Sequence, residues 1–135
     1  MKNCLLIILS FFILVSLPIQ TTSAQKSSFS AKLIKSFETG DAEMLSTLLN
    51  DNVELVIPRT ENFFAKQQAK SILVDFFRKN PIIDFTILHN GNKENASFLI
   101  GTLVSSKGSF RVSVFSRKVS NQSLIYQLRI EDPNE

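Results

Sequence analysis

The spacing of hydrophobic residues along the chain changes near Pro81. Before it, apolar residues recur at helical spacing in three stretches, and after it they alternate with polar residues. The first stretch ends at Gly40, a residue common at helix C-termini, and the second begins at Asp41, a favoured N-cap. The pattern therefore predicts helices first and a β-sheet afterwards.

The third stretch gives the clearest helical signal. Its apolar residues form one stripe along a helix that ends before Pro81. They are Ala65, Ala69, Ile72, Leu73, Phe76 and Phe77. Between the second and third helices, Val53–Ile57 alternates as a short strand that ends at Pro58.

Four further strands are predicted after Pro81, with turn-forming residues between them at Asn90-Gly91-Asn92, Lys107-Gly108 and Ser120-Asn121-Gln122. They are Ile82–His89, Ala96–Ser105, Ser109–Val119 and Ser123–Glu131. Consecutive antiparallel hairpins make a meander, and helices grouped before strands indicate an α+β fold with helices packed on one sheet face. We therefore expect the sheet to have a covered inner face and an outer face.

Pairing the strands so that apolar residues meet assigns each strand residue to one of these faces. The polar residues on the expected inner face are His89, Thr102 and Tyr126. The apolar residues on it are Ile83, Phe85, Ile87, Ala96, Phe98, Ile100, Val104, Phe110, Val112, Val114, Leu124, Leu128 and Ile130. No carboxylate lies among them, which disfavours carboxylate-based acid–base chemistry inside the fold.

The expected outer face is mixed in character but contains an apolar cluster. Its members are Leu99, Leu103, Phe115 and Ile125. A monomer rarely leaves such a cluster exposed, so we expect a homodimer about a two-fold axis; scattered surface apolar residues are the alternative. The same register sets Arg111 opposite Arg129, a repulsion that Glu131, a partner's carboxylate or a bound anion would relieve.

The first 24 residues have the features of a cleavable signal peptide. Lys2 supplies a positive charge, and the apolar run from Cys4 to Ile19 is short for a membrane span. Small residues precede Gln25, so we expect cleavage before it, with an uncleaved anchor as the alternative. The predicted product is one domain over residues 25–135, secreted or periplasmic, without membrane contact after cleavage.

Composition excludes several classes of function. Of the fifteen basic residues only Lys2 lies in the leader, and twelve residues are acidic, so the small positive charge does not indicate nucleic-acid binding. The only cysteine, Cys4, leaves with the leader and one histidine remains, so neither a metal site nor a cofactor is expected. The nucleophile motif Gly-x-Ser-x-Gly is absent.

Two short helices, a strand, a long helix and a curled meander resemble the nuclear transport factor 2-like superfamily, whose fold is a cone. Within it, the chain is similar to a small secreted family of Gram-negative bacteria classed as a domain of unknown function. The motifs that carry this similarity are Phe76-Phe77, Phe85 with His89-x-Gly91, Phe98-Leu-Ile-Gly101, Phe110-Arg-Val112 and Ile125-x-x-Leu-Arg-Ile-Glu131. The superfamily includes isomerases, dehydratases, polyketide cyclases and non-catalytic binders, so the fold does not fix the function.

Two hypotheses for the function follow. In the first, a secreted non-catalytic module dimerises through its outer face and binds a small apolar ligand or a protein partner, with His89, Thr102 and Tyr126 as the ligand-binding residues. In the second, an isomerase- or hydrolase-like enzyme uses His89 as its base and Tyr126 as an oxyanion donor. We favour the first, because a histidine at the end of a strand more often holds a turn in place.

Overall fold

The computed structural model describes residues 22–135, with side-chain surroundings from residue 28 onward. The described helices are α1 (Thr22–Thr39), α2 (Ala42–Ser46) and α3 (Lys66–Lys79). The strands are β1 (Leu49–Ile57), β2 (Thr60–Ala65), β3 (Ile82–Lys93), β4 (Ala96–Ser105), β5 (Gly108–Val119) and β6 (Gln122–Glu131). The predicted α+β fold is confirmed. Residues 1–21 of the predicted leader lie outside the described residues, and residues 22–24 belong to α1.

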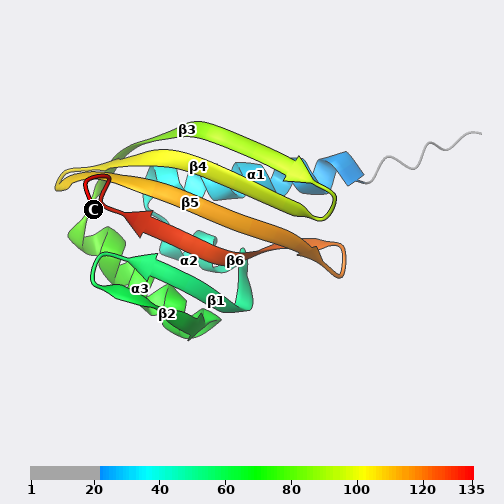
Figure 1. The fold of residues 1–135 in the computed structure, drawn as a ribbon, viewed down its shortest axis with the longest axis horizontal. Coiled ribbons are helices and arrows are strands. Elements are labelled where there is room, and N and C mark those ends of the chain that lie inside the picture. The colour runs from blue at the N-terminus through cyan, green and yellow to red at the C-terminus, as the bar shows by residue number, and fades with distance from the viewer. Residues whose placement is uncertain (1–21) are drawn as a thin grey trace, which may run out of the picture.

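The strands form one curved sheet in the order β2-β1-β6-β5-β4-β3 (Figure 1). The meander β3 to β6 is antiparallel as predicted, and β1 joins it in parallel to β6. Strand β2 was not predicted, because its six residues show no clear alternation next to the helix that follows. None of the described helices has the length and apolar character needed to span a membrane.

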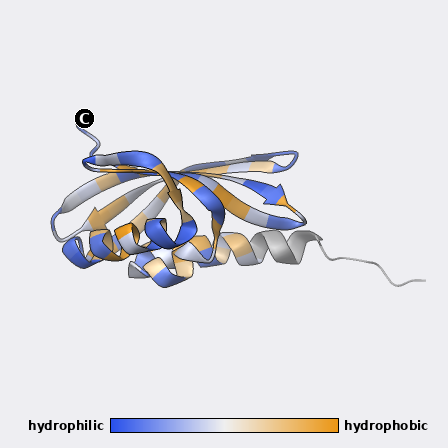
Figure 2. Ribbon diagram, turned by 90° about the horizontal axis from the view of Figure 1, so that it is seen from below, coloured by the Kyte–Doolittle hydropathy of each residue, from blue (hydrophilic) through white to orange (hydrophobic). Residues whose placement is uncertain are grey.

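Helices α1, α2 and α3 all lie on one side of the sheet, and its other side carries no helix (Figure 2). The core fills the space between these two layers. Phe37 of α1 stacks on Phe85 of β3 with ring centroids 4.9 Å apart, and Phe76 of α3 meets Phe110 of β5 edge to face at 5.2 Å. Aromatic contacts thus fasten α1 to β3 and α3 to β5, in one row across the meander.

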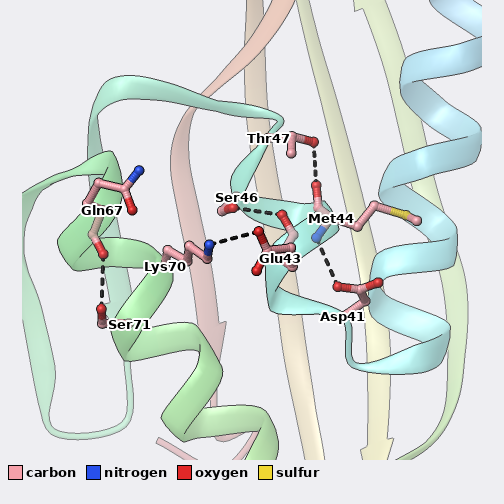
Figure 3. Close-up of polar contacts among 8 residues, drawn as sticks. All are labelled: Asp41, Glu43, Met44, Ser46, Thr47, Gln67, Lys70 and Ser71. Carbon is pink, nitrogen blue, oxygen red and sulfur yellow. Dashed lines mark hydrogen bonds and ion pairs between the residues drawn. The ribbon is translucent and has the colours of Figure 1, made fainter.

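Local capping explains where the helices meet. Gly40 has a φ of 64°, which ends α1, and a carboxylate oxygen of Asp41 accepts a hydrogen bond of 2.9 Å from the Met44 amide (Figure 3). That bond caps α2 as the sequence predicts. Glu43 then forms an ion pair of 2.9 Å with Lys70, which links α2 to α3.

The predicted faces of β4 are wrong. The hairpin turn is Ser106-Lys107, so Leu103, and not Val104, lies opposite Phe110. Because side chains alternate along a strand, a shift of one residue exchanges all of them between the faces. Leu99 and Leu103 are therefore buried under the helices, and the outer face receives the residues predicted to be inside. These are Ala96, Phe98, Ile100, Thr102 and Val104.

Bulges in β3 and β6 change the faces of two more segments. In β6, Phe115 pairs with Gln127 but Ser116 pairs with Ile125, so Tyr126 is an extra residue. The bulge places Ile125 in the core and leaves Tyr126 on the outer face, against prediction. Leu124, also predicted inside, moves to the outer face with it.

In β3 the extra residue is Leu88, because Ile87 pairs with Gly101 and His89 with Ile100. Strand β3 also continues to Lys93, beyond the predicted turn at Asn90-Gly91-Asn92. His89 therefore lies within the strand, exposed on the outer face, and does not end it.

A second bulge in β3 leaves Ile83 exposed, although it was predicted inside. The predicted pairing of Arg111 with Arg129 is also wrong. Arg111 lies opposite Glu131, and Arg129 lies opposite Ser113. Arg129 forms an ion pair of 2.8 Å with Glu131, so these positions hold no repulsive pair.

Candidate functional site

The three polar residues predicted to line the cone all lie on the outer face. His89 is exposed and Thr102 is half-buried. Tyr126 lies beside Phe115, and the Arg117 guanidinium lies over the Tyr126 ring, 4.0 Å from the ring centroid. Strands β4 and β5 separate His89 from Tyr126, a spacing of about 14 Å at the usual distance between neighbouring strands. The two side chains therefore cannot act on the same reacting atom.

The inner surface instead forms a cavity of about 200 Å³ where α1 passes the β3–β4 hairpin. The helix contributes Phe29, Ser30, Leu33 and Ile34 to its lining. The inner face of the sheet and its turns contribute Ile87, Asn90, Asn92, Glu94, Asn95, Ser97, Leu99, Val114, Ser116, Lys118 and Ser123. Gly91, Ala96 and Phe98, which the strand register assigns to the outer face, also border the cavity. His89, Thr102 and Tyr126 are not among the lining residues.

The strand register makes the inner face polar toward the hairpin. Deep in the fold the row contains the core residues Leu99 and Val114, which lie side by side. Two residues further out, Asn92 pairs with Ser97 and Ser97 with Ser116. The hydroxyl oxygens of the two serines are 2.5 Å apart, which confirms that both side chains lie on the same face. We call Asn92, Ser97 and Ser116 the polar row.

The cavity therefore has two unlike walls. Helix α1 presents mostly apolar side chains, whereas the sheet presents both the apolar side chains of Ile87, Leu99 and Val114 and the hydroxyl and amide groups of the polar row, each of which offers a hydrogen-bond donor and an acceptor. Drug-sized ligands occupy roughly 300–1,000 Å³, so this cavity fits a smaller molecule. Within the described part of the chain, no cluster of histidine, cysteine, aspartate and glutamate is arranged to hold a metal ion.

The polar row was not predicted, because the predicted turn between β3 and β4 came too early in the chain. Asn90 and Asn92 were assigned to a turn, whereas the turn lies at Glu94-Asn95, where Glu94 has a φ of 55°. Ser97 was assigned to neither predicted face of the sheet. Asn90-Gly91-Asn92-Lys93 shows no alternation of apolar and polar residues, so no local signal in the sequence indicates the longer strand.

The residues proposed for the dimer face divide into two groups. Leu99, Leu103 and Ile125 are at most 7 % exposed and belong to the core, so they are not available to a partner. Phe115, Arg111 and Arg129 do lie on the outer face. The apolar residues that accompany Phe115 there form a cluster that we call the outer patch. Its members are Phe98, Ile100, Phe115 and Tyr126.

Comparison with known proteins identifies the family. Residues 30–131 match the family model described as Domain of unknown function (DUF4783). The chain belongs to the DUF4783 family. No curated protein matches it.

Solved DUF4783 structures agree with this assignment. The chain is 40 % identical to a DUF4783 protein from Bacteroides ovatus, with a TM-score of 0.74 over 78 % of this chain and 96 % of that one. It is 32 % identical to one from Bacteroides uniformis, with a TM-score of 0.74 over 78 % and 97 % of the two chains. The predicted resemblance to a bacterial family of unknown function is therefore confirmed.

More distant structures share only the fold. A de novo designed protein with a curved β-sheet is 14 % identical, with a TM-score of 0.64 over 78 % of this chain and 99 % of that one. A domain of unknown function with a cystatin-like fold from Nostoc punctiforme is 11 % identical, with a TM-score of 0.63 over 82 % of this chain and 78 % of that one. A protein named Rd1NTF2_04 with long sheet is 17 % identical, with a TM-score of 0.64 over 77 % of this chain and 97 % of that one, and the DUF4783 domain has the nuclear transport factor 2-like cone that the resemblance implied.

Proposed function

We propose that this DUF4783 protein is an exported, non-catalytic module that binds a small ligand in the cavity beneath α1. One observation carries the proposal: an apolar helix wall faces the polar row across a cavity of about 200 Å³. Ligand-binding sites commonly combine apolar side chains with placed polar groups that fix the orientation of the ligand. The predicted signal peptide over residues 1–24 supports export.

The alternative enzyme is disfavoured by the placement of its two candidate residues. General acid–base catalysis needs groups within hydrogen-bond reach of the same substrate. His89 and Tyr126 lie on different strands of the outer face, outside the cavity. Around the cavity, the charged residues described are Glu94 and Lys118, both exposed at the ends of hairpins.

Blocking the cavity tests the proposal. Ser30 is exposed and lines the cavity from α1, so Ser30→Trp fills it without removing a buried group. Ala31→Trp, on the same helix but outside the lining, is the matched control. We expect small fragments to shift the NMR amide signals of Asn92, Ser97 and Ser116 in the control and not in Ser30→Trp. Fragments that bind both variants alike would contradict the proposal.

The outer patch favours a second function, association of two copies through the sheet. Phe98 is 40 % exposed, and its strand neighbour Phe115 packs against Tyr126 with ring centroids 6.5 Å apart. Contact with the outer patch of a second copy would remove these residues from water, and a patch that contacts itself in this way is related by a two-fold axis.

Charge supports the same arrangement. On the outer face, Glu54 and Glu61 lie on β1 and β2, at one side of the sheet. Lys93 and Arg117 lie toward the other side, on β3 and β5. A two-fold axis near the middle of the sheet brings Glu54 and Glu61 of one copy toward Lys93 and Arg117 of the other.

Light scattering tests the dimer. We expect a dimer mass for the native protein and a monomer mass for Phe98→Ser. Val74→Ser is the matched control, since Val74 is similarly exposed, at 47 %, but lies on α3 away from the outer face. A monomeric native protein, or equal loss of the dimer in both variants, would refute the arrangement.

A further inference from the structure

The cavity beneath α1 has the features of a site for a flat ring with one apolar face and several hydrogen-bonding groups. Phe29, Leu33 and Ile34 form the helix wall, which suits contact with carbon and hydrogen atoms. The opposite wall holds the polar row, with Ser123 beside it and the apolar Ile87, Leu99 and Val114 deeper in the fold. A ligand between them is therefore apolar toward the helix and polar toward the sheet.

The groups in the polar row match hydroxyls particularly well. A serine hydroxyl donates one hydrogen bond and accepts others, and an asparagine amide also does both. Ser97 and Ser116 share one hydrogen bond at 2.5 Å, so one of their two protons and several lone pairs stay available for a ligand. Ser116 is only 2 % exposed, which fixes this pair in place at the floor of the cavity.

The charges around the cavity do not favour an acid or a base. The described lining residues with charge are Glu94 and Lys118, of opposite sign. Both are exposed, at the β3–β4 turn and near the end of β5. A buried carboxylate or ammonium ligand would be unfavourable without a paired charge inside the cavity. An uncharged ligand carries no such penalty.

We infer that the cavity takes an uncharged, polyhydroxylated ring of monosaccharide size, an inference that rests on the proposed ligand-binding function. The ring lies with its C–H face against α1, and its hydroxyls bond to Asn92, Ser97 and Ser116. The volume of about 200 Å³ limits the ligand to a single ring or the end unit of a longer chain.

NMR titration of the protein with D-glucose and N-acetyl-D-glucosamine tests this ligand class, with indole and benzoate as apolar and acidic probes. We expect the sugars to shift the amide signals of the polar row. Ser116→Ala removes one hydroxyl, so sugar affinity should fall about 3- to 10-fold. Ser113→Ala is the matched control, because Ser113 is a buried serine of the same strand on the opposite face, and it should leave affinity unchanged.

The outcomes separate this inference from the proposed function. If indole or benzoate shifts the polar-row signals and the sugars do not, the ligand class is wrong but the cavity is still a binding site. If no probe shifts them, both the ligand class and the proposed function are contradicted. Equal sugar affinity in Ser116→Ala and Ser113→Ala would refute the role of the polar row.

Discussion

Gly101 occupies a position on the inner face of β4 where any side chain would collide with its neighbours. A Cβ atom there would lie 2.7 Å from a carbon of the Phe85 ring and 2.7 Å from the Thr86 carbonyl oxygen. We expect Gly101→Ala to lower the free energy of unfolding by about 1–3 kcal/mol, because the backbone oxygen cannot move aside easily. Urea denaturation measures this change.

Gly91→Ala is the comparison for this effect. Its Cβ would lie 2.6 Å from the Phe98 ring, but that ring is 40 % exposed and can rotate away. The loss of stability should therefore be smaller than for Gly101→Ala. Equal losses would show that steric crowding by backbone atoms is not the cause.

The ion pair between Arg129 and Glu131 should make stability depend on pH. Hydrogen bonds from the Arg129 guanidinium hold the pKa of Glu131 below its ordinary value. A carboxyl whose pKa is lower in the folded state stabilises the protein above its unfolded pKa of about 4.3, and this stabilisation disappears as pH falls through the folded pKa.

Glu131→Gln should therefore destabilise the protein at pH 7 and have little effect below about pH 3. Because both side chains are about a third exposed, the difference at pH 7 should be about 0.2–1 kcal/mol. Thermal unfolding at both pH values measures it, and a difference that grows on acidification would contradict the assignment.

At the scale of single elements, α2 depends on its cap. This helix has only five residues, and the Asp41 carboxylate accepts the hydrogen bond from the Met44 amide (Figure 3). Asp41→Ala should lower the free energy of unfolding by about 1 kcal/mol, whereas Asp41→Asn should retain most of it, because both side chains cap helices well. Chemical denaturation distinguishes them, and equal losses would argue against capping.

Strand β4 provides a direct test of which residues face the core. Leu103 is fully buried, whereas the side chain of its neighbour Val104 lies on the outer face. A lysine at position 103 would bury an unpaired charge, so Leu103→Lys should fail to fold, and Val104→Lys should fold normally. Circular dichroism reports the outcome, and the opposite result would restore the faces that the sequence predicted.

At the scale of the whole molecule, we propose that residues 1–24 are a signal peptide that directs export of the protein. If it is cleaved before Gln25, the mature chain starts within α1, three residues after that helix begins. We expect the intact mass of protein recovered from an exporting Gram-negative host to correspond to residues 25–135. A mass that retains residues 1–24 would instead support an uncleaved anchor.

Local sequence patterns predicted the helices, the meander and the class of fold, but not strand β2. The helical stripe of α3, the end of α1 at Gly40 and the Asp41 cap depend on residues close together in the chain, so local patterns predicted them. The change to alternation after Pro81 likewise predicted the meander. The resemblance to the nuclear transport factor 2-like superfamily implied the cone.

Only the tertiary structure decided which side chains face the cavity. A one-residue shift at the β4–β5 turn and the extra residues Leu88 and Tyr126 moved His89, Thr102 and Tyr126 outward. Side chains alternate between the faces with a period of two, so each such shift exchanges the faces of a whole segment. Because both faces of β4 carry large apolar residues, its sequence does not indicate which face is buried. The packing of a curved sheet against three helices determines which face is buried, and with it the polar row.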